Sequence, residues 1–346
     1  MERIAVVIYN LGGPDGPAAV RPFLFNLFND PLILRYPAPL RWSLAQLIAR
    51  RRAPIATDIY AQIGGGSPIL RETERQAAAL SQALRADAEY RVFVAMRYWH
   101  PFAEECAAAV AAWNPDRIVL LPLYPQFSTT TTASFLRVWR SAASTVGLDR
   151  PTATICCYPV EDGFVTAVAT LLGSALEGCD PPPRILFSAH GLPKKFVAAG
   201  DPYQIQVGMT VGAVLRRLAA PAPDHVICYQ SRVGPVEWLR PYTDDEIRRA
   251  GAEARPVIVV PVAFVSEHSE TLVELDIEYA RLARECGVPE YRRVPTVGTH
   301  PSFIDGLARL VRAASYGWTE SGSGGRLCPV DAAPCPTGVT GAATHA

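Results

Sequence analysis

The sequence predicts an α/β protein made of two similar halves, each a parallel sheet flanked by helices. Short apolar runs alternate with helical patterns along the chain, which is typical of parallel strands joined by crossover helices. The run at 257–262 is nearly all apolar, as expected for a strand buried on both faces. Two pairs of segments also repeat: IYNLGGP (8–14) aligns with FSAHGLP (187–193), and IVLLPLYPQFSTTTT (118–132) with VIVVPVAFVSEHSET (257–271). We therefore expect two facing halves with a ligand cleft between them.

The apolar runs and the helical periods give the order of the elements. Strands are predicted at 4–8, 92–96, 118–123, 153–157, 184–187, 225–229, 257–262 and 292–295. Helices are predicted at 21–29, 71–86, 102–113, up to 139, 202–218 and beyond the break at 266–270. We divide the chain into a first half (1–155), a second half (156–315) and a tail rich in Gly, Ser, Ala, Thr and Pro (316–346) that we expect to be poorly ordered.

Composition excludes several classes of protein. The 346 residues suffice for two domains of about 100–200 residues each. Lys plus Arg equals Asp plus Glu at 33 each, so no overall charge points to nucleic acid. No apolar run approaches the ~20 residues of a spanning helix, and MERIAVVIYN lacks a signal-peptide pattern, so we expect a cytoplasmic protein. The eight scattered cysteines suit a reducing compartment better than a disulfide framework.

The segment 31–52 is unusually apolar for its position and ends in the positive charges Arg50–Arg52. Its apolar stripe consists of Leu40, Leu44, Leu47 and Ile48. One interpretation is an ordinary amphipathic helix on the core, with cations at its carboxyl end. The other is an apolar lip around a large flat ligand, or a surface that touches membrane at the periphery. The sequence leaves both open.

The glycine-rich turn IGGGSPI at 63–69 is not a nucleotide site. It lacks the Lys-Ser/Thr ending of a phosphate loop and does not follow a strand. Its glycines do permit a ligand to approach the backbone closely.

Acidic residues follow the strand at 257–262. Glu270, Glu274 and Glu278 are four apart, so on a helix they lie along one face, and Glu267 joins that stripe. Like charges at this spacing repel by a few tenths of a kcal/mol per pair, which a bound cation would relieve. Such a ladder is usually only a solvated face. This one follows a buried strand, and ligands bind at the carboxyl ends of strands in open α/β sheets.

The internal repeat places the chemistry in the second half only. Leu11 stands where the second half has His190, and threonines stand where it has His268 and Glu270. Both His190 and Glu270 come just after a strand, so across a cleft they could flank a single atom. Imidazole with carboxylates suits divalent first-row metals. Zinc-hydrolase, Cys-x-x-Cys and nucleophile-elbow motifs are missing.

At these residues the chain resembles the ferrochelatase family, whose members insert ferrous iron into a porphyrin at the end of haem biosynthesis. The resemblance covers about 4–312 and runs through VVIYNLGGP, IGGGSPI, LPLYPQFS, FSAHGLP, CYQSRVGPVEWLRPYT and PVAFVSEHSETLVELDIEY, in that order. It implies two Rossmann-like, chelatase-type halves around the porphyrin, with protoporphyrin IX and Fe²⁺ as substrates. A chelatase for coproporphyrin III or for a cobalt substrate, and a non-catalytic tetrapyrrole or metal carrier, stay open as alternatives. The presence of segment 31–52 favours protoporphyrin.

The resemblance also implies roles for individual residues. His190 matches the family's active-site histidine, which contacts the metal or takes protons from pyrrole nitrogens. Glu270 matches its carboxylate partner in the iron site, and His268 assists. An acidic path for ions is implied for Glu267, Glu274 and Glu278. The residues implied to contact the porphyrin are Arg52, Tyr60, Ser67, Arg97, Tyr98, Phe264 and Trp238.

Some ferrochelatases carry a [2Fe–2S] cluster on four cysteines, three of them near the carboxyl terminus. This tail offers only Cys328 and Cys335, and Thr129 stands where the animal enzymes have another ligand. Cys156 and Cys157 stay open as the remaining ligands, but the sequence favours the absence of a cluster. The sequence does not fix the oligomeric state.

Overall fold

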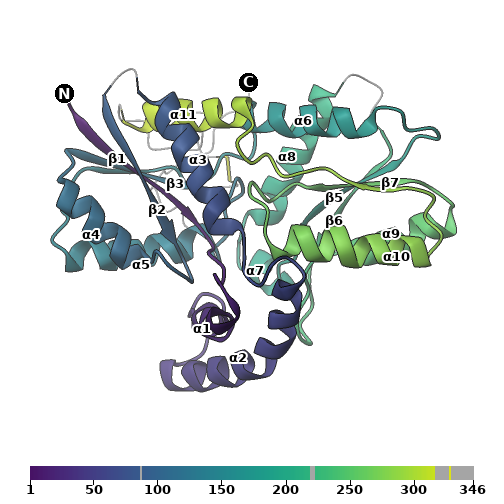
Figure 1. Ribbon diagram of the computed structural model, residues 1–346, viewed down its shortest axis with the longest axis horizontal. Coiled ribbons are helices and arrows are strands. Elements are labelled where there is room, and N and C mark those ends of the chain that lie inside the picture. Colours follow the sequence, from purple (N-terminus) through teal and green to yellow (C-terminus); the bar gives the residue numbers. More distant parts are fainter. Residues whose placement is uncertain (86–87, 219–222, 316–326, 329–346) are drawn as a thin grey trace.

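The computed structural model describes residues 1–85, 88–218, 223–315 and 327–328. Two four-stranded parallel sheets lie side by side, each with helices on both faces (Figure 1). The predicted α/β class with two similar halves is therefore confirmed. The predicted tail lies outside the described residues, apart from 327–328.

The first sheet has the strand order β2-β1-β3-β4, and every pair of neighbours is parallel. Its strands are β1 (Arg3–Asn10), β2 (Glu89–Met96), β3 (Arg117–Pro122) and β4 (Thr152–Thr154). The central strand β1 is fully buried from Ile4 to Tyr9. This burial explains why its sequence is apolar without alternation.

The second sheet repeats this arrangement with the order β6-β5-β7-β8. Its strands are β5 (Arg184–His190), β6 (His225–Gln230), β7 (Val257–Pro261) and β8 (Tyr291–Arg293). β5 therefore corresponds to β1, and β7 to β3, as the repeated segments predict. Because β5 and β7 are neighbours, the polar residues that follow them meet at one edge of the sheet.

Helices cover both faces of the two sheets and join them. They are α1 (Pro17–Phe28), α2 (Ala38–Ala61), α3 (Ile69–Ala83), α4 (Ala103–Trp113), α5 (Thr132–Thr145), α6 (Asp162–Leu176), α7 (Lys194–Ala198), α8 (Tyr203–Arg217), α9 (Thr243–Ala252), the π-helix η1 (Glu270–Tyr279), α10 (Ala280–Glu285) and α11 (Pro301–Ser315). Sequence reasoning did not identify α6, α7, α9 or α11. The last of these, α11, packs on both α6 and α3, so the end of the second half returns to the first. One apolar core consequently runs through both halves.

Two buried glutamines tie the halves together next to the polar strand ends. Gln76 of α3 donates to the carbonyl oxygens of Val265 (2.7 Å) and Gly298 (3.0 Å) in the second half. Gln126, in the turn after β3, donates to Thr210 Oγ1 of α8 at 2.9 Å. Buried amides are costly to leave unpaired, so these bonds fix the relative position of the two halves.

Helices α1 and α2 project from the two sheets as a separate arm, which we call the lip (residues 17–61; Figure 1). The predicted end of the helix at Arg50–Arg52 is wrong, because α2 continues to Ala61; arginine is a good helix former, and a run of it does not end a helix. The predicted apolar stripe is not a core face either. Leu40 and Leu47 are 49% and 45% exposed, and Trp42 and Ile55 are exposed as well. Leu44 and Ile48, the other two residues of the stripe, are half-buried, and the lip interpretation stays a prediction.

Candidate active site

A cleft of about 440 Å³ opens between the lip and the second half, and an inner pocket of about 210 Å³ adjoins it. His190, His268 and Glu270 line both spaces, together with the apolar side chains of Leu11 and Ile33. A larger hollow of about 610 Å³ beside β4 contains no histidine or cysteine, so chemistry rather than size identifies the site. The cleft combines apolar walls with a few polar groups, as ligand sites do.

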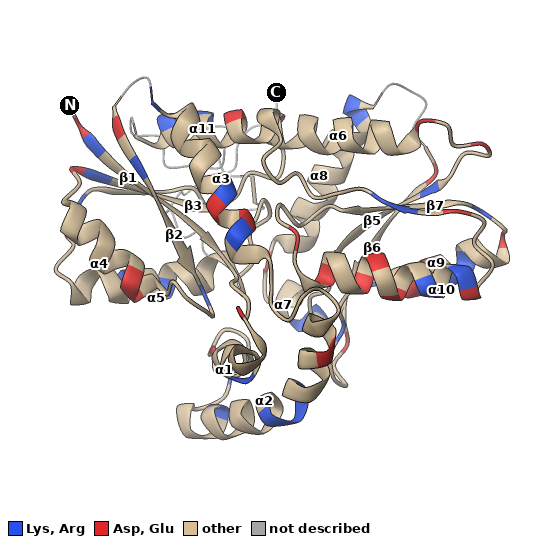
Figure 2. Cartoon of the chain, viewed as in Figure 1, with Lys and Arg blue, Asp and Glu red and all other residues tan. Residues whose placement is uncertain are grey.

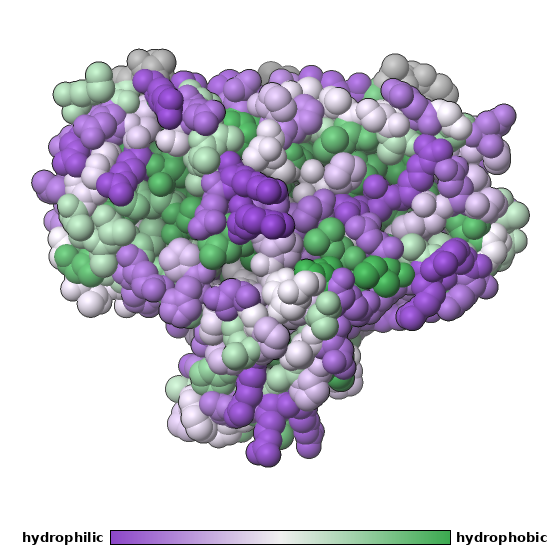
Figure 3. Space-filling model, viewed as in Figure 1, coloured by the Kyte–Doolittle hydropathy of each residue, from purple (hydrophilic) through white to green (hydrophobic). Residues whose placement is uncertain are grey.

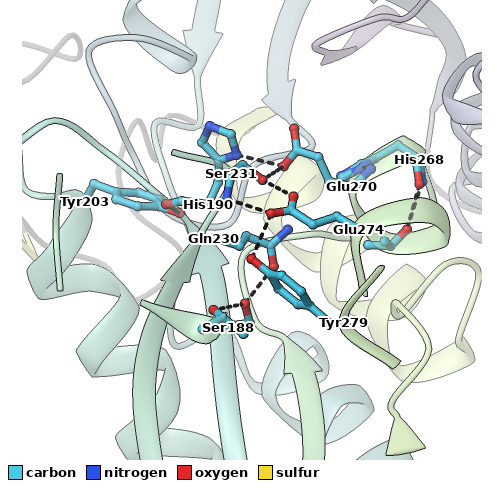
Figure 4. Close-up of polar contacts among 11 residues, drawn as sticks. Ser188, His190, Tyr203, Gln230, Ser231, His268, Glu270, Glu274 and Tyr279 are labelled. Carbon is cyan, nitrogen blue, oxygen red and sulfur yellow. Dashed lines mark hydrogen bonds and ion pairs between the residues drawn. The ribbon is translucent and has the colours of Figure 1, made fainter. Parts of the chain in front are cut away.

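His190 and Glu270 form the centre of the cleft (Figure 4). His190 ends β5, and Glu270 begins η1 after β7; His190 Nδ1 and Glu270 Oε2 are 2.7 Å apart. The expectation that they face each other across the cleft is wrong. They stand on one wall and contact each other directly, because β5 and β7 are adjacent in the same sheet. The first half contributes apolar residues such as Leu11 opposite them.

The two groups shift each other's proton affinity. Burial opposes the charge on His190, but the Glu270 carboxylate outweighs it and raises the pKa of the imidazole above its ordinary value. Burial likewise works against the Glu270 carboxylate, yet the charge and hydrogen bond of His190 lower its pKa to about 2. The His190 side chain is still 44% exposed toward the cleft. The pair therefore presents an accessible, unusually basic imidazole.

Ser231 links this pair to the next carboxylate, a contact that sequence reasoning missed. It follows β6 with a left-handed backbone, φ 64°, which is uncommon for a side-chain-bearing residue. Its N–H donates to Glu274 Oε1 at 2.9 Å, and its hydroxyl bonds both Glu274 and Glu270. Tyr279 also donates to Glu274 Oε1, at 2.9 Å. The signal available in the sequence was its place just after a strand, as for His190.

His268 supports the start of η1. Its Nδ1 accepts the Glu270 N–H at 3.0 Å, and its ring meets Phe264 edge-on with centroids 4.5 Å apart. Burial lowers the pKa of His268, although Glu270 works in the opposite direction. This imidazole is therefore less basic than that of His190. Its contacts suit orientation of the helix start.

Two of the three predicted path residues, Glu274 and Glu278, lie on one side of η1 together with Glu270. Glu270, Glu274 and Glu278 line the cleft, and the last two also line a surface opening beside α9 and α10. Figure 2 shows the acidic residues that follow one another along this part of the chain. Glu267 does not share that placement. It precedes the helix, and its Oε1 accepts from Arg293 Nη1 at 2.7 Å, outside either space.

Five of the seven predicted porphyrin contacts border the spaces around the pair: Arg52, Tyr60, Ser67 and Trp238 line the cleft, and Phe264 lines the inner pocket. Burial raises the pKa of Tyr60 to about 12, so its hydroxyl stays neutral. Trp238 packs over the turn after His190, where a Cβ on Gly191 would lie only 2.7 Å from a carbonyl oxygen of the next strand. Glycine is required at that close approach.

The structure does not bring Arg97 and Tyr98 to the cleft. Both bond the buried carboxylate of Asp30, Arg97 Nη2 at 2.7 Å and the Tyr98 hydroxyl at 2.8 Å. Tyr98 is fully buried. A carboxylate that is 1% exposed needs such partners, so these residues fasten the end of α1 to the first sheet.

Cys328 comes close to two consecutive cysteines, Cys156 and Cys157, behind the turn after β3. The sulfurs of Cys156 and Cys157 are 3.5 Å apart. Gln206 Nε2 lies 3.4 Å from Cys157 Sγ and 3.2 Å from Cys328 Sγ. Hydrogen bonding with the other two thiols, together with burial, raises the pKa of Cys157. Within the described ranges, no three His, Cys, Asp or Glu side chains form a complete site for a single metal ion.

Comparison with known proteins gives the family. A sequence model described as Ferrochelatase matches residues 3–315. The chain is 53% identical to the ferrochelatase of Caulobacter vibrioides over 342 residues, 97% of each chain. It is 45% identical to that of Rickettsia bellii over 341 residues, which are 96% of this chain and 95% of the other.

Solved structures with the same fold are more distant in sequence. SirB from Bacillus subtilis, solved with Fe³⁺, superposes with a TM-score of 0.55 at 12% identity, covering 92% of this chain and 99% of SirB. CbiX, the terminal enzyme of sirohaem biosynthesis in denitrifying bacteria, gives 0.50 at 15% identity, covering 90% and 99%. These likenesses establish the two-domain chelatase fold, and the sequence matches establish more: the chain belongs to the ferrochelatase family.

Proposed function

We propose that this ferrochelatase inserts Fe²⁺ into protoporphyrin IX, with His190 and Glu270 as its metal and proton-transfer centre. The observation that supports this most is the His190–Glu270 pair, 2.7 Å apart at the base of an apolar cleft. A lyase of this family exchanges two pyrrole protons for one Fe²⁺, and the iron is not oxidised. The site must therefore supply a base, ligands that replace water on iron, and walls that hold a flat ring.

Each of these requirements has a candidate in the cleft. His190, with its raised pKa, accepts a pyrrole proton, and Glu270 stabilises the imidazolium that results. Glu274 and Glu278 offer carboxylate oxygens for the hydrated ion along η1. Leu11 and Ile33 provide apolar surface for the ring. A rigid cleft that favours a bent ring exposes the pyrrole lone pairs and lowers the barrier to metal entry.

The charge of the cleft favours protoporphyrin over coproporphyrin. Among its described lining residues, Arg52 and Arg232 are the arginines, and there is no lysine. Arg232 already pairs with both oxygens of Asp244 at 2.9 Å, so the cleft offers at most two cations for propionates. Protoporphyrin has two propionates and coproporphyrin III has four, and unpaired carboxylates are costly to enclose. We expect kcat/KM for protoporphyrin IX to exceed that for coproporphyrin III by at least about tenfold.

Anaerobic Fe²⁺ insertion, followed as loss of porphyrin fluorescence, tests both the reaction and the substrate. Multiple turnover excludes a carrier, which would bind porphyrin stoichiometrically and stop. Equal rates with both porphyrins would contradict the charge argument while leaving the reaction intact. Faster insertion of Co²⁺ into a sirohydrochlorin would support the cobalt alternative.

We propose further that the lip makes peripheral contact with membrane. The apolar side chains of Leu40, Trp42, Leu47 and Ile55 are exposed on it, and the same helix carries Arg50–Arg52. Figure 2 shows these basic positions along α2, and Figure 3 shows apolar and hydrophilic side chains mixed on the lip. Apolar and cationic groups together suit an anionic lipid surface. No helix within the described ranges is long and apolar enough to cross a bilayer.

Replacing Leu47 with glutamate is expected to weaken binding to vesicles that contain anionic lipid by about tenfold, because one apolar side chain contributes roughly 1.5–3 kcal/mol when buried. Cosedimentation with vesicles measures this. Val146→Glu is the matched control, since Val146 is also exposed but lies at the end of α5, away from the lip. Equal losses in both variants, or none in Leu47→Glu, would contradict the proposal.

We propose further that Cys156, Cys157 and Cys328 hold an iron–sulfur cluster, which departs from the absence that the sequence favours. The sequence favoured its absence because the tail offers only two cysteines. The three thiols lie near one another but are not arranged as a metal site within the described residues. A cluster needs four ligands, and Cys335, the fourth candidate, lies outside those residues. A bound cluster would keep these thiols deprotonated and supply an electron-transfer or structural centre away from the cleft.

Anaerobically purified protein is expected to show the visible absorption of a cluster, and Cys328→Ser is expected to lose it. Cys179→Ser is the control, because Cys179 lies at the end of α6 and its thiol bonds the carbonyl of Ala175. If the wild type and both variants were colourless and had the same iron content, the protein would hold no cluster. The proposal for the chelatase site would be unaffected.

A further inference from the structure

The glutamates of helix η1 do not explain why this segment adopts the wide π-helical form. It keeps π-helical geometry over ten residues, Glu270–Tyr279, whereas most π segments are single turns inserted in an α-helix. A geometry this rare needs support from outside the helix. That support must also hold Glu270, Glu274 and Glu278 toward the cleft.

The acidic residues of this region divide into two sets. Glu270, Glu274 and Glu278 line the cleft, whereas Glu267 and Asp276 line neither the cleft nor the surface opening. The second set has one common partner, Arg293 of β8. We call Arg293, Glu267 and Asp276 the clamp.

The contacts of the clamp span the helix and the loop before it. Arg293 Nε donates to Asp276 Oδ1 at 2.7 Å, and its Nη2 donates to the other oxygen of the same carboxylate. Its Nη1 donates to Glu267 Oε1 at 2.7 Å, and that oxygen also accepts the N–H of Thr296 at 2.9 Å. One guanidinium therefore fixes both the start and the middle of the segment. Only arginine offers this forked arrangement of donors.

The position of β8 makes the clamp rigid. Arg293 pairs in register with Val259 of β7, the strand that leads directly into η1. Tyr291, two residues earlier on β8, donates its hydroxyl to the Leu275 carbonyl oxygen at 2.8 Å, within the helix. The Arg293 side chain is only 10% exposed. Arg293 also lowers the pKa of Glu267 overall although burial opposes it, so this pair is ionised at neutral pH.

We propose that Arg293 is a positioning residue, which holds η1 in its wide form through Glu267 and Asp276 and so sets the spacing of the three glutamates that handle iron. It touches neither iron nor porphyrin. The proposal rests on the role of those glutamates given above. It assigns Glu267 to the clamp rather than to the ion path.

Arg293→Gln is expected to raise KM for Fe²⁺ about tenfold and to leave the dissociation constant for protoporphyrin IX unchanged, since the supporting partners of metal-handling groups typically matter by ~10–100-fold. Arg293→Lys keeps the positive charge but cannot bond Asp276 and Glu267 at the same time through a planar guanidinium, so it is expected to restore the KM for Fe²⁺ only in part. Asp276→Asn releases the helix and keeps the Glu267 contact. It serves as the second variant if Arg293→Gln does not fold.

Arg292→Gln is the matched control. Arg292 is the neighbouring residue of the same strand; it pairs with Glu290 at 2.7 Å and donates to the carbonyl oxygens of Ala175 and Glu177, none of which belongs to η1. Hydrogen–deuterium exchange of residues 270–279 gives a readout that does not depend on turnover. We expect faster exchange there in Arg293→Gln and Asp276→Asn, and unchanged exchange in Arg292→Gln.

The outcomes separate the clamp from the proposed function. Faster exchange together with a higher KM for iron supports the clamp. Faster exchange with a normal KM for iron would show that Arg293 only stabilises the helix, and would overturn the positioning role. Unchanged exchange in Arg293→Gln would overturn that role as well. Absence of turnover in the wild type would contradict the proposed reaction itself. That failure is distinguishable from failure of the clamp, because it is measured before any variant is compared.

Discussion

Replacing His190 with alanine is expected to lower kcat at least about 100-fold and to leave porphyrin binding intact. General-base groups typically contribute 10²–10⁴-fold, and His190 is the histidine of the cleft whose pKa is raised. His268 cannot take over this role. Its pKa is lowered, and its Nδ1 is occupied by the Glu270 N–H at 3.0 Å. The measurement is anaerobic iron insertion beside a fluorescence titration with protoporphyrin.

The chain contains a matched control for the loss of a histidine–carboxylate pair. His100 Nδ1 lies 2.9 Å from Glu105 Oε2, and both side chains are exposed in the first half. His100→Ala removes the same type of contact at a residue that lines neither the cleft nor the inner pocket, and is expected to retain wild-type turnover. If His190→Ala lost no more than His100→Ala, His190 would not be the base.

Much of the fold was predictable because its signals are local. Parallel strands buried on both faces give uninterrupted apolar runs, and the repeated segments at the ends of β1 and β5, and of β3 and β7, gave the two-fold plan. The carboxyl ends of these strands then located His190 and Glu270. The edge strands β4 and β8 have three residues each, too few for their limits to be read from composition.

What the sequence could not provide were contacts between distant segments. Spacing placed Glu267 in the glutamate stripe, but spacing carries no information about Arg293, which the β7–β8 register brings to it from 26 residues away. The resemblance implies a porphyrin contact for Arg97, and it carries no information about the partner that Arg97 actually has, Asp30, 67 residues away. The meeting of Cys328 with Cys157 depends on tertiary structure in the same way.

Glu270→Gln is expected to lower kcat/KM for iron by about 10–100-fold, since the carboxylate that orients an active imidazole typically contributes that much. Its effect on pH dependence is more diagnostic. His190 must be neutral to accept a pyrrole proton, so activity falls as pH falls through its pKa. Glu270 raises that pKa, so its removal should move the acid limb of the kcat/KM profile to lower pH. Glu105→Gln, which alters the partner of His100, should leave the profile unchanged.

The double variant His190→Ala/Glu270→Gln distinguishes a coupled pair from two independent groups. If Glu270 acts mainly through the imidazole 2.7 Å away, the double variant should be no slower than His190→Ala alone. If Glu270 acts on the iron independently, the two losses should multiply. Suppose that the acid limb is unchanged in Glu270→Gln and that the two losses multiply. Glu270 would then act on the metal, and the raised pKa of His190 would be due to Glu274, the other carboxylate in its surroundings.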